Sequence, residues 1–259
     1  MQFATFHDLE DQSVFITGGG SGIGADLTKG FLSQGAKVTF VQRSNPEKFL
    51  AECEGKYKYE PTFIKCDVSH IEELKIALQT TAKEQGAVTV LVNNAANDTR
   101  HTLDEFTSQQ WDQTMEVNLK PHFFAAQEVV EGMKISGGGS IINFSSISYM
   151  MGNEGYPAYA TAKSAITGLT RSLARELGPH SIRVNAIMPG WVLTKRQMKL
   201  WATEEGLSKH LDRQCLKEPL GALDLLPRHR RHSWRLVYPV PMVGNWIVHV
   251  SPRCHSTER

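Results

Sequence analysis

A tyrosine and a lysine four positions apart carry the clearest chemistry in the sequence. Tyr159 and Lys163 stand in the run YATAK, and this spacing places both on one face of a predicted helix. A phenol titrates at about pH 10, which is too high for a base at neutral pH. We expect the neighbouring ammonium to favour the phenolate and to lower this pKa. A tyrosine tuned in this way can take the proton from an alcohol while hydride leaves the alcohol carbon.

Two further polar residues complete a candidate catalytic group. Ser146 lies just beyond a predicted strand, and its hydroxyl can hold a substrate oxygen as charge develops there. Asn118 lies inside a predicted helix, which is a poor place for asparagine. A local disruption of that helix could position a water that links Lys163 to solvent. A tyrosine–lysine pair alone also fits a half-buried ring beside a solvated charge, so the prediction depends on the combination.

A glycine-rich run, TGGGSGIG at residues 17–24, follows a predicted strand and precedes a predicted helix. Gly18, Gly22 and Gly24 would let the backbone turn tightly and approach a pyrophosphate closely. The helix N-terminus supplies unpaired N–H groups and a partial positive charge. A plain glycine-rich turn is the alternative, but the strand-to-helix context favours a dinucleotide site.

The segments that follow three other predicted strands bear on how a coenzyme would be bound. An acidic residue about 20 positions after the glycine run would bind the ribose 2′-hydroxyl of NAD, but Gln42 and Arg43 stand there instead. Arg43 would hold the 2′-phosphate of NADP or be a solvated charge, and Gln42 can still bond a ribose hydroxyl. Asp67 would accept a hydrogen bond from adenine or cap a helix. The small residues of Asn94–Ala96 would let the cofactor lie close to the backbone.

Short apolar stretches alternate with longer helical ones, which is typical of βαβ units around a parallel sheet. We predict strands at Ser13–Thr17, Lys37–Val41, Thr62–Cys66, Val88–Val92, Ser140–Phe144 and Arg183–Met188. We predict helices at about Ile23–Gln34, Ile71–Gln85 and Ala158–Leu177, and a long one from Ser108 past Asn118 towards Met133 with a kink at Pro121. The expected fold class is α/β, a Rossmann-type doubly wound parallel sheet flanked by helices in a single domain.

Composition narrows the class of protein. The formal net charge of +1 among 259 residues gives no reason to expect nucleic acid or an anionic membrane as a partner. The sequence shows no apolar run of membrane-spanning length and no secretory signal pattern. The four cysteines form no CxxC pair, so we expect no disulfide framework, no metal site and a cytoplasmic location.

Taken together, TGGGSGIG, NNAA, Asn118, Ser146, YATAK and Pro189-Gly190 resemble the short-chain dehydrogenase/reductase family over about residues 9–220. The resemblance implies that Asn118, Ser146, Tyr159 and Lys163 form a catalytic tetrad. It implies that Lys163 binds the nicotinamide ribose and that the oxidised ring also lowers the pKa of Tyr159. It further implies a homotetramer or homodimer. The predicted coenzyme residues are Gly18, Ser21, Gly22, Ile23, Gly24, Gln42, Arg43, Asp67, Val68, Asn94, Ala95, Ala96, Tyr159, Lys163, Pro189, Gly190, Val192 and Thr194.

Substrate choice is expected in three segments, Asn97–His101, Ser148–Tyr156 and the run after Trp191. Their polar side chains suit a polyhydroxylated ligand better than a fatty chain, although Trp191 could merely pack a lid. The segments resemble those of sugar 1-dehydrogenases such as galactose 1-dehydrogenase, which implies oxidation of an aldose at its anomeric carbon to a lactone. That subgroup, and the absence of a basic residue at Ser21, favour NAD over NADP. The predicted substrate residues are Asn97, Ser146, Ser148, Asn153, Tyr159 and Trp191.

Two other functions stay open. One is an NAD(P)H-dependent carbonyl or 3-oxoacyl reductase, which a substrate screen would separate from sugar oxidation. The other is a catalytically idle cofactor-binding protein, which the complete tetrad disfavours.

The resemblance stops abruptly after Leu220. The family normally closes with a helix, a seventh strand and a TGxxxxVDGG-like segment, and none of these follows. The remaining residues are rich in Arg, His, Pro and Trp, with Trp246–Val250 as a candidate strand. We expect a catalytic domain at residues 1–220 and an atypical segment at 221–259. Our hypothesis for this segment is a reading-frame change near Gly221 or a partly disordered tail.

Overall fold

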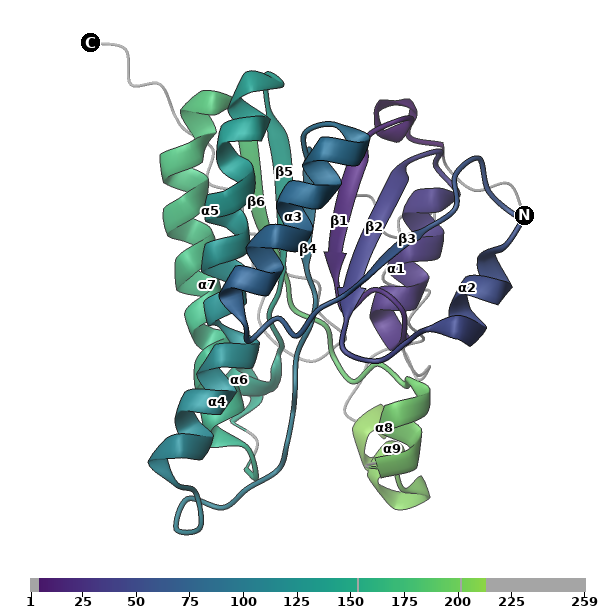
Figure 1. The fold of residues 1–259 in the computed structure, drawn as a ribbon. Helices are drawn as coiled ribbons and strands as arrows, with labels where there is room; N and C mark the ends of the chain where they lie inside the picture. The colour runs from purple at the N-terminus through teal and green to yellow at the C-terminus, as the bar shows by residue number, and fades with distance from the viewer. Residues whose placement is uncertain (1–4, 153, 201, 213–259) are drawn as a thin grey trace.

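In the part of the chain that the structure describes, six parallel strands form a central sheet (Figure 1). The computed structural model describes residues 5–152, 154–200 and 202–212. The strand order is β3-β2-β1-β4-β5-β6, and every neighbouring pair is parallel. This confirms the predicted α/β doubly wound sheet. The strands are β1 (Ser13–Thr17), β2 (Lys37–Gln42), β3 (Thr62–Lys65), β4 (Val90–Asn93), β5 (Gly139–Phe144) and β6 (Ile182–Ile187).

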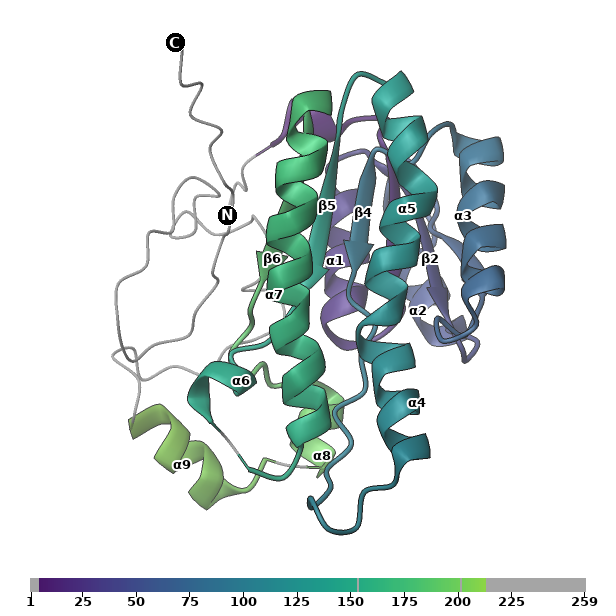
Figure 2. The same ribbon diagram turned by 90° about the vertical axis from the view of Figure 1, so that its left-hand side faces the viewer.

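Helices cover both faces of the sheet (Figures 1 and 2). One face carries α3 (Ile71–Gln85), α5 (Lys120–Ile135) and α7 (Pro157–Leu177), and the other carries α1 (Gly22–Leu32) and α2 (Glu47–Cys53). Side chains alternate along β1, so Phe15 packs in the core beneath the first group. Its neighbours Val14 and Ile16 pack in the core beneath α1. Because both faces are covered, all five residues of β1 are buried, as expected for a parallel strand.

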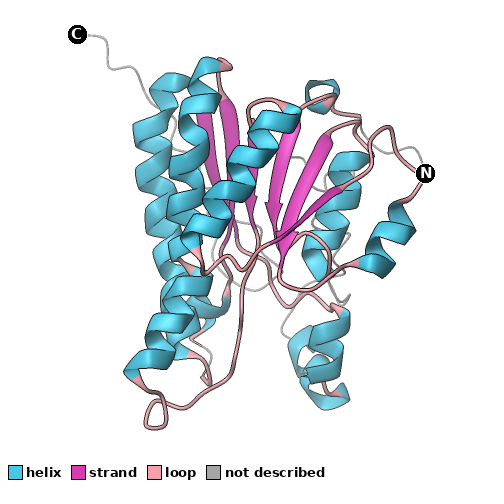
Figure 3. Cartoon of the chain, viewed as in Figure 1, coloured by secondary structure: helices cyan, strands magenta, loops and turns pink. Residues whose placement is uncertain are grey.

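The remaining helices extend beyond the carboxyl ends of the strands, where the arrowheads point in Figure 3. They are α4 (Ser108–Asn118), α6 (Ser148–Met151), α8 (Lys195–Leu200) and α9 (Glu204–Asp212). Short 3₁₀ turns lie at His7–Leu9 and Gly178–His180. The sequence did not predict α2, α6, α8 or α9, because each has at most nine residues, fewer than the roughly 11–18 residues over which a helical period is recognised.

The prediction of a single long helix from Ser108 towards Met133 is wrong. It is two helices, α4 and α5, separated at Leu119, where φ is −128° and ψ is −54°. Pro121 lies in the first turn of α5, where its missing N–H breaks no helical hydrogen bond. Helix α4 therefore ends before the proline, with Asn118 as its last residue, and no kinked helix continues through Pro121.

The ends of the other predicted elements differ from the structure by only a few residues, and α3 matches Ile71–Gln85 as predicted. Within the described part of the chain, no helix is long and apolar enough to cross a membrane. No group of three His, Cys, Asp or Glu in that part could hold a metal ion. The predicted segment 221–259 and its candidate strand Trp246–Val250 lie outside the described residues.

Candidate active site

A glycine turn joins β1 to α1 at the carboxyl end of the sheet. Gly18 has a φ of 71°, in the left-handed region that favours glycine. A Cβ on Gly24 would lie 1.8 Å from the carbonyl oxygen of Gly18, so no side chain fits there and the helix approaches the turn closely. Ser21, the N-cap of α1, makes no side-chain capping hydrogen bond. The Ser21 side chain therefore does not compete with a phosphate for the first N–H groups of α1.

The segment after β4 is tied to this turn. The Asn94 Nδ2 donates to the carbonyl oxygens of Thr17, at 3.0 Å, and Gly18, at 3.1 Å. The Thr17 hydroxyl accepts the N–H groups of Asn94 and Ala95, at 2.9 and 3.0 Å. Strands β1 and β4 are neighbours where the strand order reverses, which is where open α/β sheets bind ligands. Two of the predicted coenzyme segments are thereby joined into one surface.

The segment after β6 reaches the same turn from the other side. A Cβ on Gly22 would lie 3.3 Å from the Thr194 Cγ2, and the Pro189 carbonyl oxygen accepts the N–H of Ile147 at 3.3 Å. Side chains at Gly22 and Gly24 would contact neighbouring atoms, so the glycines keep the backbone of this turn accessible. This suits a dinucleotide, which approaches the backbone closely. Of the other predicted coenzyme residues, Val68, Pro189 and Val192 are buried, Ile23 and Gly190 are partly buried, and Ser21 and Ala96 are exposed.

The residues predicted to select the coenzyme have protein partners. The Gln42 Oε1 accepts the N–H of Gly20 at 3.0 Å, so this side chain braces the glycine turn. The exposed Arg43 guanidinium lies 3.8 Å from the Asp67 carboxylate. The Asp67 Oδ1 accepts both the N–H and the hydroxyl of Ser69, at 3.0 and 2.8 Å. Asp67 therefore caps the turn before α3, and contacts of these residues with adenine or ribose stay predictions.

Tyr159 lies in the first turn of α7 and is partly buried. Ser146, in the loop after β5, lies near enough to favour the ionised form of the Tyr159 phenol. The Ser146 Oγ also accepts the N–H of Ser148 at 3.2 Å, which fixes the serine at the start of α6. Ser148 itself is buried, and its hydroxyl has no hydrogen-bond partner among the described residues. Two hydroxyls, Ser146 and Tyr159, are thus available to one substrate oxygen.

Lys163 lies one turn further along α7 and is only 1% exposed. Its Nζ donates to the Phe144 carbonyl oxygen at 2.7 Å and lies 5.5 Å from the centre of the Tyr159 ring. Burial lowers the pKa of Lys163 to about 7, and the charge of Asp98 opposes this change. Lys163 can therefore both release and accept a proton near neutral pH.

The lowering of the Tyr159 pKa that the neighbouring ammonium is expected to cause is not found. Burial raises the pKa of Tyr159 above its ordinary value, and the Asp98 carboxylate adds to the rise, whereas Ser146 and Arg100 oppose it. Lys163 does not activate the phenol directly, because its Nζ is directed to the Phe144 carbonyl oxygen. Burial therefore outweighs the two groups that favour the phenolate, Ser146 and Arg100.

Asn118 is fully buried at the end of α4 and holds the loop after β4. Its Oδ1 accepts the Asn97 N–H at 2.9 Å, and its Nδ2 donates to the Asn97 carbonyl oxygen at 3.1 Å. The same Nδ2 also donates to the Thr114 carbonyl oxygen at 3.0 Å. The side chain of Asn118 thus positions the predicted substrate residue Asn97, which is itself exposed.

The loop after β4 meets α8 at Asp98. Its carboxylate accepts from the Arg196 Nη2 at 3.2 Å and from the Gln197 Nε2 at 2.9 Å. The indole N–H of Trp191 donates to the Gln197 Oε1 at 3.0 Å. Because the charge of Asp98 also acts on Tyr159, this chain of contacts forms a wall next to the candidate base.

Trp191 also packs edge to face against His210 of α9, with ring centres 5.3 Å apart. These contacts support the interpretation that Trp191 packs a lid, and its contact with substrate stays a prediction. The predicted substrate residue Asn153 lies outside the described residues.

Sequence analysis did not single out three groups that organise the site. The Thr17 hydroxyl binds two backbone N–H groups, Asp98 anchors α8, and the Phe144 carbonyl oxygen receives Lys163. Thr17 ends a strand and Asp98 follows Asn97, so position alone could have marked both residues. A backbone carbonyl leaves no signal in the sequence.

Comparisons with known proteins agree with this geometry. A family model described as "short chain dehydrogenase" matches residues 12–205. The chain is 48% identical over 224 residues to "Probable galactose dehydrogenase GalD" of Rhizobium meliloti (strain 1021), covering 85% of this chain and 87% of the relative. It is 46% identical over 218 residues to a D-xylose 1-dehydrogenase of Caulobacter vibrioides (strain NA1000 / CB15N), covering 84% and 86%.

A solved structure of a short-chain type dehydrogenase/reductase from Mycobacterium ulcerans superposes with a TM-score of 0.80 at 25% identity. The match covers 86% of this chain and 82% of the solved one.

Proposed function

The chain belongs to the short-chain dehydrogenase family, and from that premise we propose that it oxidises a cyclic aldose at its anomeric carbon to a lactone. The observation that carries the proposal is that Ser146 and Lys163 both lie beside Tyr159: Ser146 favours its phenolate, and the Lys163 Nζ lies 5.5 Å from the centre of its ring. The three groups lie at the carboxyl end of the sheet, beside the glycine turn. Proteins of this family use NAD or NADP, and we propose that this one uses NAD.

The chain's own residues divide the work of proton removal. We assign to Ser146 the binding of the substrate oxygen, because its hydroxyl lies beside Tyr159 and favours the phenolate. Tyr159 then takes the proton from that oxygen as general base. When bound, the nicotinamide supplies the acceptor for the hydride and a positive charge that favours the phenolate. Lys163, with its pKa of about 7, can take up the proton that Tyr159 later passes on.

The proposed coenzyme site uses the glycine turn for the pyrophosphate and the residues after β2 for the adenosine ribose. Gln42 is available to a ribose hydroxyl only in competition with Gly20. Arg43 lies on the surface near Asp67, whose negative charge would repel a 2′-phosphate. This neighbour supports NAD over NADP.

A sugar is proposed as substrate because the two relatives described above are named for galactose and D-xylose. Independent support comes from the wall around Asp98, whose carboxylate, guanidinium and amide groups suit a ligand with several hydroxyls. We also propose a homotetramer or homodimer and a cytoplasmic location. We retain the catalytic domain at residues 1–220.

Absorbance at 340 nm with NAD or NADP against a panel of aldoses tests the proposal. Reduction of NAD by galactose or a related aldose, with a lactone as product, is the expected result. If none of the sugars reduces either coenzyme, the substrate assignment is refuted. Oxidation of NADPH by 3-oxoacyl or other carbonyl compounds would then identify the reductase alternative, and coenzyme binding without any turnover would identify the idle one.

A further inference from the structure

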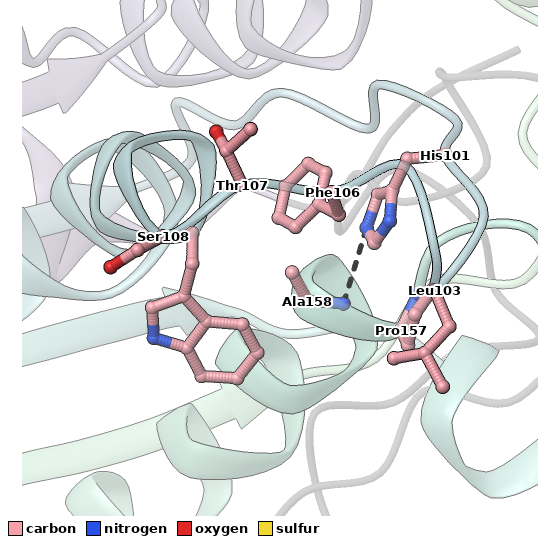
Figure 4. Close-up of a pocket in the computed structure, with 8 residues that line it drawn as sticks. His101, Leu103, Phe106, Thr107, Ser108, Pro157 and Ala158 are labelled. Carbon is pink, nitrogen blue, oxygen red and sulfur yellow. Dashed lines mark hydrogen bonds between the residues drawn. The ribbon is translucent and has the colours of Figure 1, made fainter.

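His101 lies in the loop between β4 and α4 and contacts the start of α7 in two ways. Its backbone N–H donates to the Gly155 carbonyl oxygen at 2.9 Å. Its Nε2 accepts the Ala158 N–H at 3.4 Å, the bond drawn as a dashed line in Figure 4. Ala158 immediately precedes Tyr159, so one side chain from a distant loop bonds the backbone next to the candidate base.

The hydrogen bonds define the state of the imidazole. The Nδ1 lies 3.0 Å from the Thr102 carbonyl oxygen, which can only accept. The Nε2 faces the Ala158 N–H, which can only donate. A neutral ring with its proton on Nδ1 satisfies both bonds, whereas the other tautomer and the imidazolium satisfy at most one. The ring is also stacked on Phe106, with centres 3.6 Å apart and an interplanar angle of 15°.

Helix α7 lacks the usual N-terminal cap. Its N-cap residue, Tyr156, makes no side-chain capping hydrogen bond, and Pro157 has no N–H to donate. The Ala158 N–H is therefore one of the donors that a helix start leaves without an intrahelical partner. His101 supplies the missing acceptor from outside the helix. In Figure 4 the imidazole lies beside the Phe106 ring and faces Ala158 in the first turn of α7.

Arg100, the residue before His101, also contacts the start of α7. The Arg100 guanidinium lies 3.9 Å from the centre of the Tyr156 ring, and Tyr156 packs edge to face on Tyr159 at 5.7 Å. Arg100 and His101 thus hold the two residues on either side of Pro157. The loop after β4, which Asn118 fixes at its base, is in this way connected to the first turn of α7.

We propose that His101 is a positioning residue that holds Tyr159 in place by capping the first turn of α7 with a neutral imidazole. The proposal rests on the assigned role of Tyr159 and is independent of which substrate the enzyme oxidises. A general base must lie within hydrogen-bond reach of the proton it removes, and a displacement of about 1 Å can lower a rate about 100-fold.

Two substitutions in the full chain separate capping from packing. His101→Phe keeps a ring for Phe106 but removes the acceptor, whereas His101→Gln offers a side-chain oxygen to the Ala158 N–H. We expect kcat to fall roughly tenfold or more in His101→Phe with KM for the coenzyme within about twofold, and to recover largely in His101→Gln. Leu103→Ala, an exposed position in the same loop, is the control and should behave as the wild type. A His101→Phe variant within twofold of the wild-type kcat, or a His101→Gln variant equally impaired, would overturn the proposal.

A second measurement needs no substrate. Nitrogen-15 NMR of the imidazole in the wild-type protein should show the neutral tautomer protonated on Nδ1. Amide exchange at Ala158 should be slower in the wild type and in His101→Gln than in His101→Phe. A wild-type ring protonated on Nε2 would overturn the proposal even if His101→Phe failed to fold. Equal exchange in the three folded proteins would overturn it as well. Because these readouts do not depend on turnover, they stay decisive if the sugar assignment fails.

Discussion

The side-chain amide of Asn118 pairs with both backbone polar groups of Asn97, accepting from its N–H at 2.9 Å and donating to its carbonyl oxygen at 3.1 Å. Because Asn118 is fully buried, this pair fixes the start of the loop that carries Asp98 and His101. The asparagine of the predicted tetrad therefore acts through the shape of this loop as well as through any water.

Asn118→Ala should destabilise the loop and lower turnover together. It leaves the Asn97 N–H and carbonyl oxygen without their protein partner, and such a loss costs about 1–3 kcal/mol. Urea unfolding should show this decrease in the free energy of unfolding, and kcat should fall. Asn118→Asp keeps one acceptor but loses the donor and buries a charge, so it should not rescue either property. An alanine variant with unchanged kcat would contradict the positioning role.

Tyr159→Phe should abolish most turnover without preventing coenzyme binding. The substitution removes the hydroxyl that takes the substrate proton, and general-base catalysis contributes about 10²–10⁴-fold. We expect kcat/KM to fall by about this factor, while coenzyme affinity, followed by protein fluorescence, changes little. Ser146→Ala is the companion variant and should also slow the reaction. Turnover by Tyr159→Phe at the wild-type rate would show that another group is the base.

Lys163 should make the stability of the coenzyme-free protein depend on pH. Its pKa is lowered by burial from an ordinary 10.5 to about 7. Between these values the unfolded chain binds the proton and the folded chain does not, so the free energy of unfolding rises with pH in this window, by at most about 1.4 kcal/mol per pH unit. In Lys163→Met this contribution is absent.

Urea unfolding at pH 7, 8 and 9 measures this effect. The stability of Lys163→Met relative to the wild type should be highest at pH 7 and should decrease as the pH rises. Loss of the bond to the Phe144 carbonyl oxygen shifts the whole curve but not its slope. Lys83→Met, at an exposed position of α3, serves as the control and should follow the wild type. Parallel curves for all three proteins would exclude the lowered pKa.

Asp98→Asn should move the pH–activity profile to lower pH. After burial, the Asp98 carboxylate is the largest cause of the raised pKa of Tyr159, and it also raises the pKa of Lys163. Removal of its charge lowers both values, so the phenolate forms at lower pH. The variant Gln197→Met loosens the anchor of Asp98 but keeps the charge, and its profile should move less. A profile that does not move in Asp98→Asn would contradict this electrostatic coupling.

Arg43→Ala should report on the coenzyme. If the exposed guanidinium contributes to binding a 2′-phosphate, its loss should raise KM for NADP roughly 10- to 150-fold, because a hydrogen bond to a charged group contributes about 1.5–3 kcal/mol. KM for NAD should stay within about twofold of the wild-type value. Steady-state kinetics with both coenzymes measures the two constants. Equal increases for NAD and NADP would show that Arg43 acts on the fold of the site and not on the phosphate.

The sequence by itself determined the α/β class, the six strands and the glycine turn. These features depend on local patterns, namely apolar runs, helical periodicity and glycines that a tight turn requires. The four-residue spacing of Tyr159 and Lys163 likewise placed both on one helical face, as the structure has it.

Only the tertiary structure decided which groups these residues meet. Lys163 bonds a backbone carbonyl, Asp98 bonds α8 across 98 positions, and Thr194 lies against Gly22. The raised pKa of Tyr159 follows mainly from burial, and the spacing between Tyr159 and Lys163 in the sequence does not reveal how deeply the phenol is buried. Contacts between distant segments arise from how strands and loops pack, so the pattern of one segment does not contain them.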